Sequence, residues 1–547
     1  MRLCLALSLW WATLSTVTHA WSPSVTSFVR TTTSSSNNRK TRLVLHSTTT
    51  TSADTLPTFQ LFNSKSRQKE ALQTIQEGSV KMYTCGPTVY DSAHVGNFRA
   101  FLTYDVLKRA LQYFGWEVDH ICNLTDVDDK IIQRCERDGV DVETLTNQCT
   151  QDFMTDLESL NIVPARAYPR ATQHIPDMVE LIQLLEQNGL AYQTKDSSWY
   201  FATQQQEGYG THLVNLQVDE MQSQERTSAT DDSGKQHWQD FCLWKAYKEG
   251  VDRDDATWDT PIGRGRPGWH LECSAMSRVY LGDTIDVHCG GIDLKFPHHE
   301  NEIAQSEGAT GKPFCNCWVH NGFVNIGNEK MSKSTGNFLT LRQACPKPDD
   351  VRAYRYLVVS SQYRNPLSFT EQAMDGAKKS LKRIDKVRDS IQAALQDTTT
   401  TTASSSLSVL ATETVPAQLA NFETALLDDL SMPRAAASLF ALVKAAEAEF
   451  KTDTPDVAGL AAIDDALQQM DKVFGIFYQV PMTEEEQAQQ EESTVVPETV
   501  LELVGQRTVA KEAKDWELAD SLRARITELG FAVKDVKGGE PEISRLE

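Results

Sequence analysis

Beyond its first residues, the sequence of 547 residues lacks a long apolar run and lacks an excess of positive charge. Without an apolar segment long enough to cross a bilayer, we expect a soluble mature protein that has no membrane partner. The formal net charge of −22 has the wrong sign for a general nucleic-acid binder. Any RNA partner would therefore have to be held by a local basic surface.

The sequence also lacks the cysteine pattern of a disulfide framework. Its eleven cysteines are spread over a large chain, unlike the dense cysteines of small secreted domains. Cys315 and Cys317 are separated by one residue rather than by the two residues of a usual zinc knuckle. We expect these two side chains to be buried or free.

Acidic residues are absent from the N-terminus until Asp54. An apolar run over residues 3–14, followed by small residues, predicts a secretory-type signal over residues 1–20. Residues 21–55 are basic and rich in Ser and Thr, as in a transit peptide. Because Trp21 follows the expected cleavage site, the two segments resemble the bipartite presequences of algae with secondary plastids. We expect import into a plastid (chloroplast), with mitochondrial import as a second destination. The alternative is plain secretion.

The length exceeds what one hydrophobic core supports, so three or four domains are expected. Alternating strand-like and helix-like patterns predict an α/β fold, a Rossmann-like parallel-sheet domain split by an insertion, followed by a helical bundle and a small C-terminal domain. A Thr/Ser run at 398–406 and an acidic run at 483–492 are interpreted as linkers. The predicted ranges are 56–175 and 264–313 for the halves of the sheet domain, 176–263 for the insertion, 314–378 for a loop region, 379–482 for the helical domain and 483–547 for the C-terminal domain.

The first strand, loop and helix of the predicted sheet hold an unusual set of polar side chains. Residues 79–84 are β-prone, and residues 98–114 carry apolar residues at helical spacing. The loop between them lies at the carboxyl end of a parallel strand, where helix N-termini bind phosphate. Cys85, His94, Gly96 and Arg99 gather there, so we expect a nucleotide site beside a thiol.

Four residues form a candidate zinc site. His298 and Glu302 are four residues apart at the start of a predicted helix, so they share one face. Cys85 and Cys273 are expected at the ends of two strands, with residues 268–276 interpreted as the strand that leads to Cys273. Two thiolates, an imidazole and a carboxylate suit tetrahedral zinc, and an incoming thiol could displace the carboxylate. Taken singly, a buried cysteine is more often a small hydrophobe, and His299 is expected to be structural or an outer partner.

The loop Lys330-Met-Ser-Lys-Ser334 carries two lysines after a strand-like stretch. A lysine on a closing loop can stabilise the charge that develops on the α-phosphate during adenylation. A basic loop alone is not specific, but its pairing with His94-Val-Gly-Asn97 is difficult to attribute to chance.

With these motifs in order, the chain resembles the class I aminoacyl-tRNA synthetases, and among them the cysteinyl-tRNA synthetase family. The resemblance runs from about Phe59 nearly to the end, interrupted by the Thr/Ser linker and by the divergent 200–235 region. The matching motifs are Cys85-Gly-Pro-Thr-Val-Tyr-Asp91 through Arg99, Asn123-Leu-Thr-Asp-Val-Asp-Asp-Lys130, Gly265-Arg-Pro-Gly-Trp-His-Leu-Glu-Cys-Ser-Ala-Met276, Gly290-Gly-Ile-Asp-Leu294, Pro297-His-His-Glu-Asn-Glu302, Asp428-Asp-Leu-Ser-Met-Pro433 and Lys514-Asp-Trp-Glu-Leu-Ala-Asp520.

The resemblance implies a cysteine–tRNA ligase that activates L-cysteine with ATP to cysteinyl-adenylate and transfers it to the 3′ end of tRNA(Cys) in organellar translation. It implies one Zn²⁺ per chain, Mg²⁺ with the ATP, and an anticodon-binding domain at the C-terminus; we expect a monomer. The implied metal ligands are Cys85, Cys273, His298 and Glu302, and the implied catalytic residues are His94, Asn97, Lys330 and Lys333. ATP contacts are expected from Thr88, His94, Gly96, Asn97, Arg99 and Lys333, and contacts to the cysteine substrate from Cys85, Gly86, Thr125, Trp269 and Asp293. For tRNA we expect Arg507, Lys511, Lys514, Trp516, Arg523 and Arg525.

Two departures from the family pattern are visible. Val95 and Asn97 replace the usual Ile and His of the four-residue signature, although Asn can still donate a hydrogen bond to phosphate. Many relatives end with a tryptophan and arginines after the glycine near Gly539, whereas this chain ends Glu540-Pro-Glu-Ile-Ser-Arg-Leu-Glu547, so the family pattern does not predict its terminal tRNA contacts.

Three other functions compete with this one. Ligases that join cysteine to an amino sugar share the catalytic region and its zinc but lack the C-terminal domain, which residues 500–539 match here. A zinc hydrolase built on His298 and Glu302 leaves the 330–334 loop unexplained. A non-enzymatic RNA-binding relative would have degenerate motifs, whereas His94 and Lys333 are intact.

Overall fold

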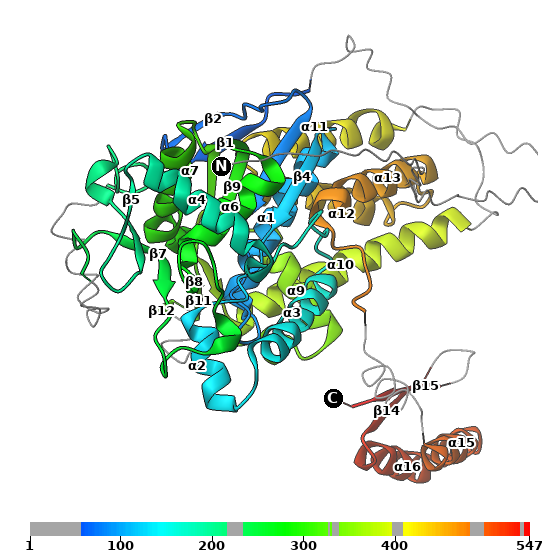
Figure 1. The fold of residues 1–547 in the computed structure, drawn as a ribbon. Helices are drawn as coiled ribbons and strands as arrows, with labels where there is room; N and C mark the ends of the chain where they lie inside the picture. Colours follow the sequence, from blue (N-terminus) through cyan, green and yellow to red (C-terminus); the bar gives the residue numbers. More distant parts are fainter. Residues whose placement is uncertain are drawn as a thin grey trace, which may run out of the picture. The chain divides into compact units, whose positions relative to one another are not determined.

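The structure is a computed structural model that describes residues 56–215, 234–326, 329–330, 338–396, 408–481, 497–535 and 541–546 (Figure 1). The expected presequence, the two expected linkers and Lys333 lie outside these residues. Within them, no helix is both long enough and apolar enough to span a membrane.

A parallel sheet of four strands forms the centre of the catalytic region. Its strands are β3 (Ser79–Thr84), β4 (Glu117–Cys122), β9 (Ile285–Gly291) and β10 (Cys315–Asn321), in the order β10-β9-β3-β4. The α/β prediction is confirmed, because β3 runs parallel to both β4 and β9 and β9 runs parallel to β10. The β9 strand is buried over six consecutive residues, as expected for a strand covered on both faces.

Helix α1 (Val95–Tyr113) connects β3 to β4. Its apolar residues, such as Phe98, Leu102 and Leu111, are fully buried. The next helices are α2 (Asp129–Asp138) and α3 (Val142–Ser159), capped at their N-termini by the side chains of Asp128 and Asp141. Because α1 begins where β3 ends, its N-terminus lies at the carboxyl edge of the sheet.

Residues 269–276 are helical, which corrects the prediction of a strand over 268–276. They belong to α6 (Trp269–Leu281), which Gly268 precedes as its N-cap, and the strand before them is the short β8 (Gly265–Pro267). The next helix, α7 (Glu300–Thr310), follows the turns at Ile292–Leu294 and Lys295–His299. All residues from Leu271 to Ser277 are buried, and a short run buried on every side has no period that separates a helix from a strand.

The insertion contains an antiparallel sheet packed with helix α4 (Ile175–Gln187). Its strands are β5 (Ala191–Gln193), β6 (Trp199–Phe201), β7 (Phe241–Ala246) and β8, in sequential order. Trp199, Phe201 and Trp244 belong to one buried cluster with apolar residues of α4, α6 and α7. The insertion is therefore packed against the two helices that follow it.

Two β-hairpin and loop regions border the sheet. Strands β1 (Gln60–Asn63) and β2 (Gln68–Ala71) form an antiparallel hairpin, and β11 (Val324–Ile326) pairs with β12 (Glu329–Lys330) and β13 (Leu367–Phe369). Helix α8 (Leu341–Ala344) is short.

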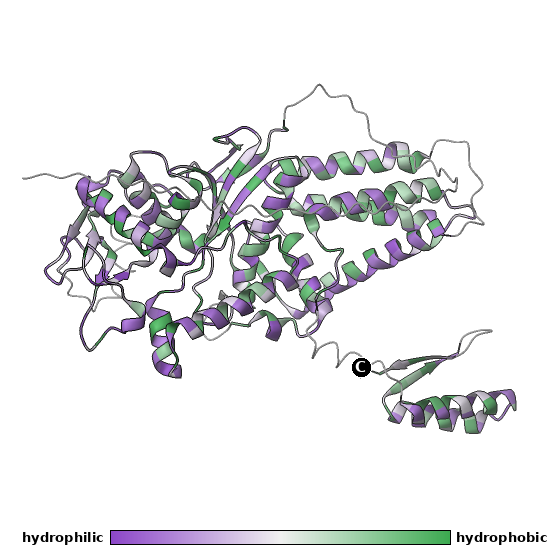
Figure 2. Cartoon of the chain, turned by 45° about the vertical axis from the view of Figure 1, so that its right-hand side comes forward, coloured by the Kyte–Doolittle hydropathy of each residue, from purple (hydrophilic) through white to green (hydrophobic). Residues whose placement is uncertain are grey.

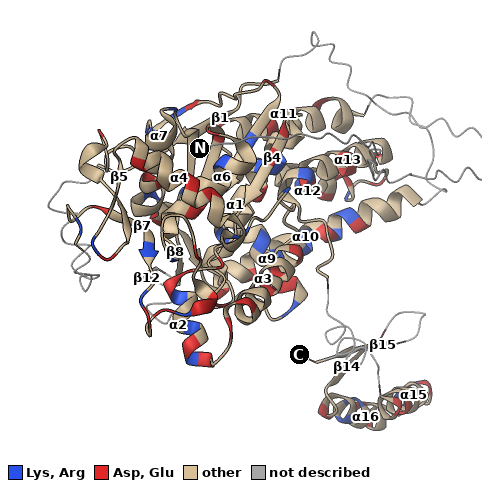
Figure 3. Ribbon diagram, in the orientation of Figure 1, with Lys and Arg blue, Asp and Glu red and all other residues tan. Residues whose placement is uncertain are grey.

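The helical region consists of α9 (Pro348–Val359), α10 (Glu371–Gln396), α11 (Val415–Leu427), α12 (Met432–Glu449) and α13 (Val457–Phe474). Hydrophobic and hydrophilic residues alternate in bands along the long helices (Figure 2). The buried Arg355 of α9 connects this region to α1, because its Nη2 lies 2.7 Å from Asp105 Oδ2 and donates to the carbonyl of Phe474. Acidic and basic residues are interspersed, for example on α10 and α16 (Figure 3).

The C-terminal region has a small core of its own. Helices α15 (Glu498–Glu512) and α16 (Trp516–Glu528) pack with strands β14 (Phe531–Lys534) and β15 (Glu542–Arg545) around residues that include Leu503, Leu522 and Phe531. The break between α15 and α16 falls at Lys514, which adopts a left-handed backbone (φ 59°), and Asp515 caps α16.

Candidate metal and nucleotide site

The four predicted zinc ligands lie together in the structure. One donor atom from each of Cys85, Cys273, His298 and Glu302 lies within 4.8 Å of the other three, and all four residues are buried. The two Sγ atoms are 4.0 Å apart, Cys85 Sγ is 3.7 Å from Glu302 Oε1, and His298 Nε2 is 2.8 Å from the same Oε1. Two sulfurs, one nitrogen and one oxygen at these separations match the donor set of a zinc site.

The chain around the cluster explains how these side chains converge. Cys85 directly follows β3, while Cys273 is on α6 rather than at a strand end. His298 precedes α7 and Glu302 lies in its first turn. Gly86 allows the close approach, because a Cβ at that position would lie 1.6 Å from the carbonyl oxygen of Asn123.

Charge is distributed unevenly within the cluster. A hydrogen bond from Cys85 lowers the pKa of Cys273 to about 6, whereas burial raises the pKa of Cys85 well above its usual value. Burial opposes the charged form of His298, but the attraction of Glu302 and Cys273 raises its pKa to about 10. Against burial, His288 and His298 lower the pKa of Glu302 well below its usual range. The cluster therefore favours a thiolate and a carboxylate, which are metal-binding forms.

A row of histidines supports the cluster, and of these the sequence predicted His299 as a structural or outer partner but not His288 or His320. Ser64 Oγ lies 2.8 Å from His320 Nδ1, His320 Nε2 lies 2.8 Å from His299 Nδ1, and His299 Nε2 lies 3.3 Å from Cys85 Sγ. His288 Nε2 contacts the second oxygen of Glu302 at 2.6 Å. Cys85, His288, His299 and Glu302 make a second set with ligand-like spacing. No local spacing could have revealed His288 and His320, because they come from separate strands, β9 and β10.

The residues predicted to surround the cysteine substrate lie around the cluster. Trp269 stacks on His298 with ring centroids 4.3 Å apart and is 38% exposed, so it covers the cluster from the solvent side. Thr125 is buried, and its hydroxyl donates to Glu272 Oε2 at 2.8 Å. Asp293 is exposed on the turn after β9. The amide of Gly86 donates to Asn123 Oδ1 at 3.0 Å, which orients the loop that carries Cys85.

His94 and Asn97 form the N-terminal cap of α1. His94 Nδ1 accepts from the Asn97 amide, and Asn97 Oδ1 accepts from the His94 amide, each at 3.1 Å. This reciprocal cap fixes both side chains at the helix start, and Gly96 lies between them. Thr88 forms an isolated bridge with Thr125, so the loop after β3 and the loop after β4 lie side by side. The positive end of the α1 dipole favours phosphate at this position.

Arg99 does not lie where the sequence predicted, and the prediction of an ATP contact is wrong. Only 1% of Arg99 is exposed, and its Nη2 donates to the carbonyls of Tyr363 (3.1 Å) and Asn365. Burial lowers the pKa of this guanidinium to about 10. Arg99 therefore joins α1 to the loop before β13.

The two lysines of the predicted phosphate loop are only partly described. Lys330 pairs with Asn325 through the backbone ladder of β11 and β12. Lys333 lies outside the described residues. The roles of both lysines stay predictions.

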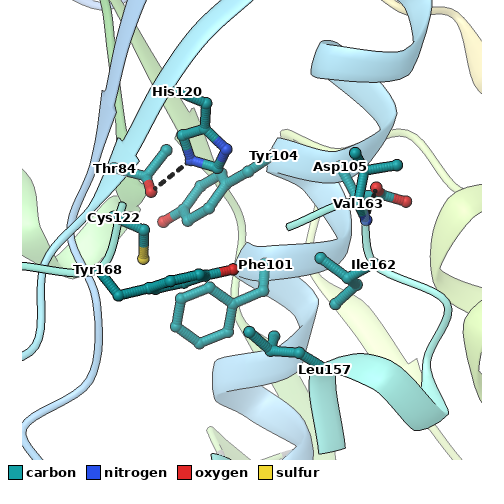
Figure 4. A pocket seen from close by; sticks show the side chains of 10 residues that line it. All are labelled: Thr84, Phe101, Tyr104, Asp105, His120, Cys122, Leu157, Ile162, Val163 and Tyr168. Carbon is teal, nitrogen blue, oxygen red and sulfur yellow. Dashed lines mark hydrogen bonds between the residues drawn. The ribbon is translucent and has the colours of Figure 1, made fainter. Parts of the chain in front are cut away.

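A small apolar cavity lies beside this site, between β3, β4 and α1 (Figure 4). Tyr104, Cys122 and Tyr168 are among its lining residues, and His120 Nε2 lies 3.0 Å from Thr84 Oγ1 on one wall. Burial lowers the pKa of His120 to about 3. The cavity is far too small for a nucleotide or an amino acid.

Models of three protein families match the chain. They are the class I (C) catalytic domain of tRNA synthetases over residues 71–379, the DALR domain over residues 421–479 and the cysteinyl-tRNA ligase anticodon-binding domain over residues 494–540. The chain belongs to the cysteinyl-tRNA synthetase family.

Characterised relatives agree with this membership. The cysteine–tRNA ligase of Lactiplantibacillus plantarum is 38% identical over 483 residues, which cover 88% of this chain and 98% of the relative. That of Caldicellulosiruptor saccharolyticus is 40% identical over 480 residues, with the same coverage. The chain is therefore a class I aminoacyl-tRNA synthetase that attaches cysteine to tRNA, and the match to the anticodon-binding domain distinguishes it from amino-sugar ligases.

A solved structure shows the same fold at low sequence identity. Methionyl-tRNA synthetase of Mycobacterium tuberculosis in complex with methionyl-adenylate superposes with a TM-score of 0.51 and 16% identity, covering 73% of this chain and 90% of that chain. At this identity the likeness supports the class I fold and nothing finer.

The residues predicted to contact tRNA differ in whether their side chains are exposed and able to reach a bound tRNA. Arg507 is buried and forms a two-point ion pair with Asp535 (2.8 and 3.0 Å), which Lys511 also contacts at 2.8 Å. The prediction for Arg507 is therefore wrong, because its guanidinium is used inside the domain. Arg523 and Arg525 are exposed on α16, Lys514 is exposed at the turn before it, and Trp516 is 60% exposed. These four remain candidates.

None of the ten described cysteines forms a disulfide with another described cysteine. Nine of them are buried, including Cys315 and Cys317 as expected, and Cys242 on β7 is half-buried. The absence of a disulfide among the described residues agrees with the cysteine pattern of the sequence.

Proposed function

We propose that this synthetase recognises cysteine through a zinc ion held by Cys85, Cys273, His298 and Glu302. The observation that carries the proposal is the convergence of these four buried donors within 4.8 Å of one another. Zinc would supply a Lewis acid that favours a thiolate as its partner.

The protein side of this recognition comes from the groups around the donors. His288 holds the second oxygen of Glu302, so the carboxylate keeps a fixed partner whichever ligand shares the metal. His299 contacts Cys85 and is itself held by His320. Trp269 shields His298 from water on the outer side.

This arrangement accounts for selection of cysteine over serine. A pocket that admits the larger sulfur cannot exclude oxygen by size, and hydrophobic contacts discriminate a methylene-sized difference by only ~1–3 kcal/mol. A thiol with a pKa near ~8.5 deprotonates readily at a metal, whereas an alcohol does not. The decisive test is removal of the metal with a chelator, followed by competition between cysteine and serine in ATP–pyrophosphate exchange. Unchanged selectivity without zinc would show that the metal is only structural.

We also propose that the α1 N-terminus binds the ATP phosphates. His94 and Asn97 are positioned by their reciprocal cap, and the helix dipole favours negative charge there. Lys333 acts on the transition state, and Mg²⁺ accompanies the ATP phosphates. Lys333→Ala should slow cysteine-dependent ATP–pyrophosphate exchange by roughly 100-fold while leaving the KM for cysteine near normal. Exchange at a near-normal rate would contradict this role for Lys333.

The same exchange assay, continued with transfer to tRNA(Cys), tests the whole reaction. A cysteine-dependent exchange that is followed by charging of tRNA is expected. Charging should stop, with exchange retained, when tRNA(Cys) is replaced by an amino-sugar acceptor.

We further propose that the protein is a monomer that serves plastid translation, with mitochondrial import as a second destination. The composition of residues 1–55 supports organelle import. Residues 1–55 fused to a fluorescent protein should direct it to the plastid, whereas fluorescence in the secretory pathway would support plain secretion. Light scattering of the mature chain should give the mass of one chain.

A further inference from the structure

A groove beside the proposed metal cluster is lined by two cations, Arg67 and Lys295. Arg67, Lys295, Asp293 and Phe296 line it together with Leu213 and Asn215. Within the part of the chain that the structure describes, neither Arg67 nor Lys295 forms an ion pair with a carboxylate. In a chain of net charge −22 such a pair of cations is conspicuous.

The two cations come from different elements but are close enough to interact. Arg67 is on the turn between β1 and β2, and Lys295 is on the turn between β9 and α7. Arg67 is exposed, whereas Lys295 is half-buried. Burial and the nearby Arg67 lower the pKa of Lys295, which means that the two positive charges oppose each other in the absence of an anion.

One wall of the groove is fixed by Glu300 of α7. The buried carboxylate of Glu300 accepts hydrogen bonds from the amides of Gly210 (2.9 Å), His212 (3.0 Å) and Leu213 (2.9 Å), and it lies 2.9 Å from His212 Nδ1. Leu213 is thereby held at the groove, 3% exposed. A wall with this many buried contacts is a defined surface rather than a loose loop.

The opposite wall is fixed on strand β10. The amide of Ser64 donates to the Trp318 carbonyl at 2.9 Å, and Asn63 Nδ2 donates to the Asn316 carbonyl at 2.9 Å. These contacts secure the turn that carries Arg67. The groove is thus built from three separately anchored segments, and it adjoins Asp293 at the substrate end of the site.

We propose that Arg67 and Lys295 bind phosphates of the single-stranded 3′ end of tRNA and guide it to the activated cysteine. The reaction requires this end to reach the site, and at the edge of that site the groove offers two cations that pair with no carboxylate of the described residues. Half-buried apolar side chains such as Phe296, together with the exposed Ile292, provide surface for unpaired bases.

The test uses the variant Arg67→Asn/Lys295→Gln in the full-length protein. Asn suits the left-handed backbone of Arg67 (φ 60°), so both changes remove charge without a fold defect. Charging of tRNA(Cys) should show a KM for tRNA raised roughly ten-fold, and two lost phosphate contacts should reduce the slope of log affinity against log salt by about 1.4. ATP–pyrophosphate exchange should be unchanged. Lys444→Ala, an exposed lysine on α12, serves as the control and should change neither measurement.

A second measurement assigns the effect to the 3′ end. Affinities of wild type and variant are compared for tRNA(Cys) and for tRNA(Cys) that lacks its four 3′-terminal nucleotides. The truncation should weaken binding to the wild type and have little effect on the variant, because both changes remove the same contact. Equal weakening in the two proteins would overturn the proposal. A raised KM for ATP in exchange would overturn it too, since the cations would then bind nucleotide phosphates.

Discussion

In the proposed function, Cys273 takes part in both metal binding and substrate binding. Its Sγ lies 4.0 Å from that of Cys85, and its lowered pKa favours the thiolate. We expect Cys273→Ser to weaken zinc binding by more than ~100-fold and to raise the KM for cysteine as well. The effect is this large because the substitution removes a direct metal ligand, not a residue that only holds a ligand in place. Zinc content after dialysis against a chelator and the KM for cysteine check the two effects.

The control for this substitution is Cys149→Ser. Cys149 is also buried, but it belongs to the large core cluster of the sheet and the helical region, apart from the ligands. It should lower thermal stability without changing zinc content. Retained zinc in Cys273→Ser would contradict the assignment of this ligand.

At the same scale, the sequence predicted that the four donors gather, but it did not predict the histidines around them. The convergence of the donors was predictable because His298 and Glu302 are four residues apart and all four residues belong to recognisable motifs. His288 and His320 were not predictable, since only the pairing of β9 with β10 brings them to the cluster. Arg99 was misassigned because a guanidinium near a phosphate site suggests ATP, whereas the fold buries it against backbone carbonyls.

At the scale of elements, α7 connects the proposed metal site to the insertion. Glu300 lies between His298 and Glu302 in the sequence and accepts hydrogen bonds from three amides of the segment around His212. Hydrogen bonds to a charged acceptor contribute ~1.5–3 kcal/mol each. Glu300→Ala should therefore speed hydrogen exchange at the Gly210, His212 and Leu213 amides by roughly 10- to 100-fold.

Glu136→Ala on the exposed face of α2 is the matched control and should leave those amides unchanged. Equal exchange in Glu300→Ala and wild type would show that the segment is held by other contacts.

His120, on strand β4, should make the free energy of unfolding depend on pH. The pKa of its side chain is about 3 in the folded protein, whereas the ordinary pKa of a histidine is 6.5. Because the unfolded chain binds the proton first, stability falls as the pH drops from 6.5 towards 3, by about 1.4 kcal/mol per pH unit. His120→Gln should be less stable than wild type at pH 7, and the difference in unfolding temperature should narrow at lower pH. A constant difference would contradict a buried neutral imidazole.

Elements with a clear period were predicted well, and those without one were not. Strand β3 and helix α1 follow their patterns closely. The segment at residues 268–276 was predicted as a strand because its sequence shows no clear helical period, and in the structure Leu271–Ser277 are all buried. The break between α15 and α16 depends on the left-handed backbone of Lys514. Lysine does not usually adopt this conformation, so the sequence did not indicate the break.

At the scale of the whole molecule, the C-terminal region has a core separate from that of the catalytic region. Deleting residues 490–547 should therefore spare ATP–pyrophosphate exchange and reduce charging of tRNA(Cys) at least about 100-fold, because anticodon contacts are lost. Parallel assays of exchange and charging check this. Unchanged charging by the truncated chain would place the main tRNA contacts elsewhere.

A finer version replaces single side chains. Arg523→Ala and Arg525→Ala on the exposed face of α16 should raise the KM for tRNA several-fold. Arg507→Ala should instead destabilise the small domain, since it breaks the ion pair with Asp535.

The uneven burial of the thiols makes the protein suited to site-directed labelling. Cys242 is the one cysteine of the described residues that is not buried, and it lies on β7 of the insertion. A maleimide dye at limiting concentration should react there first, while Cys85 and Cys273 are protected by burial. A fluorophore so placed would report on the insertion while tRNA binds, without an engineered cysteine.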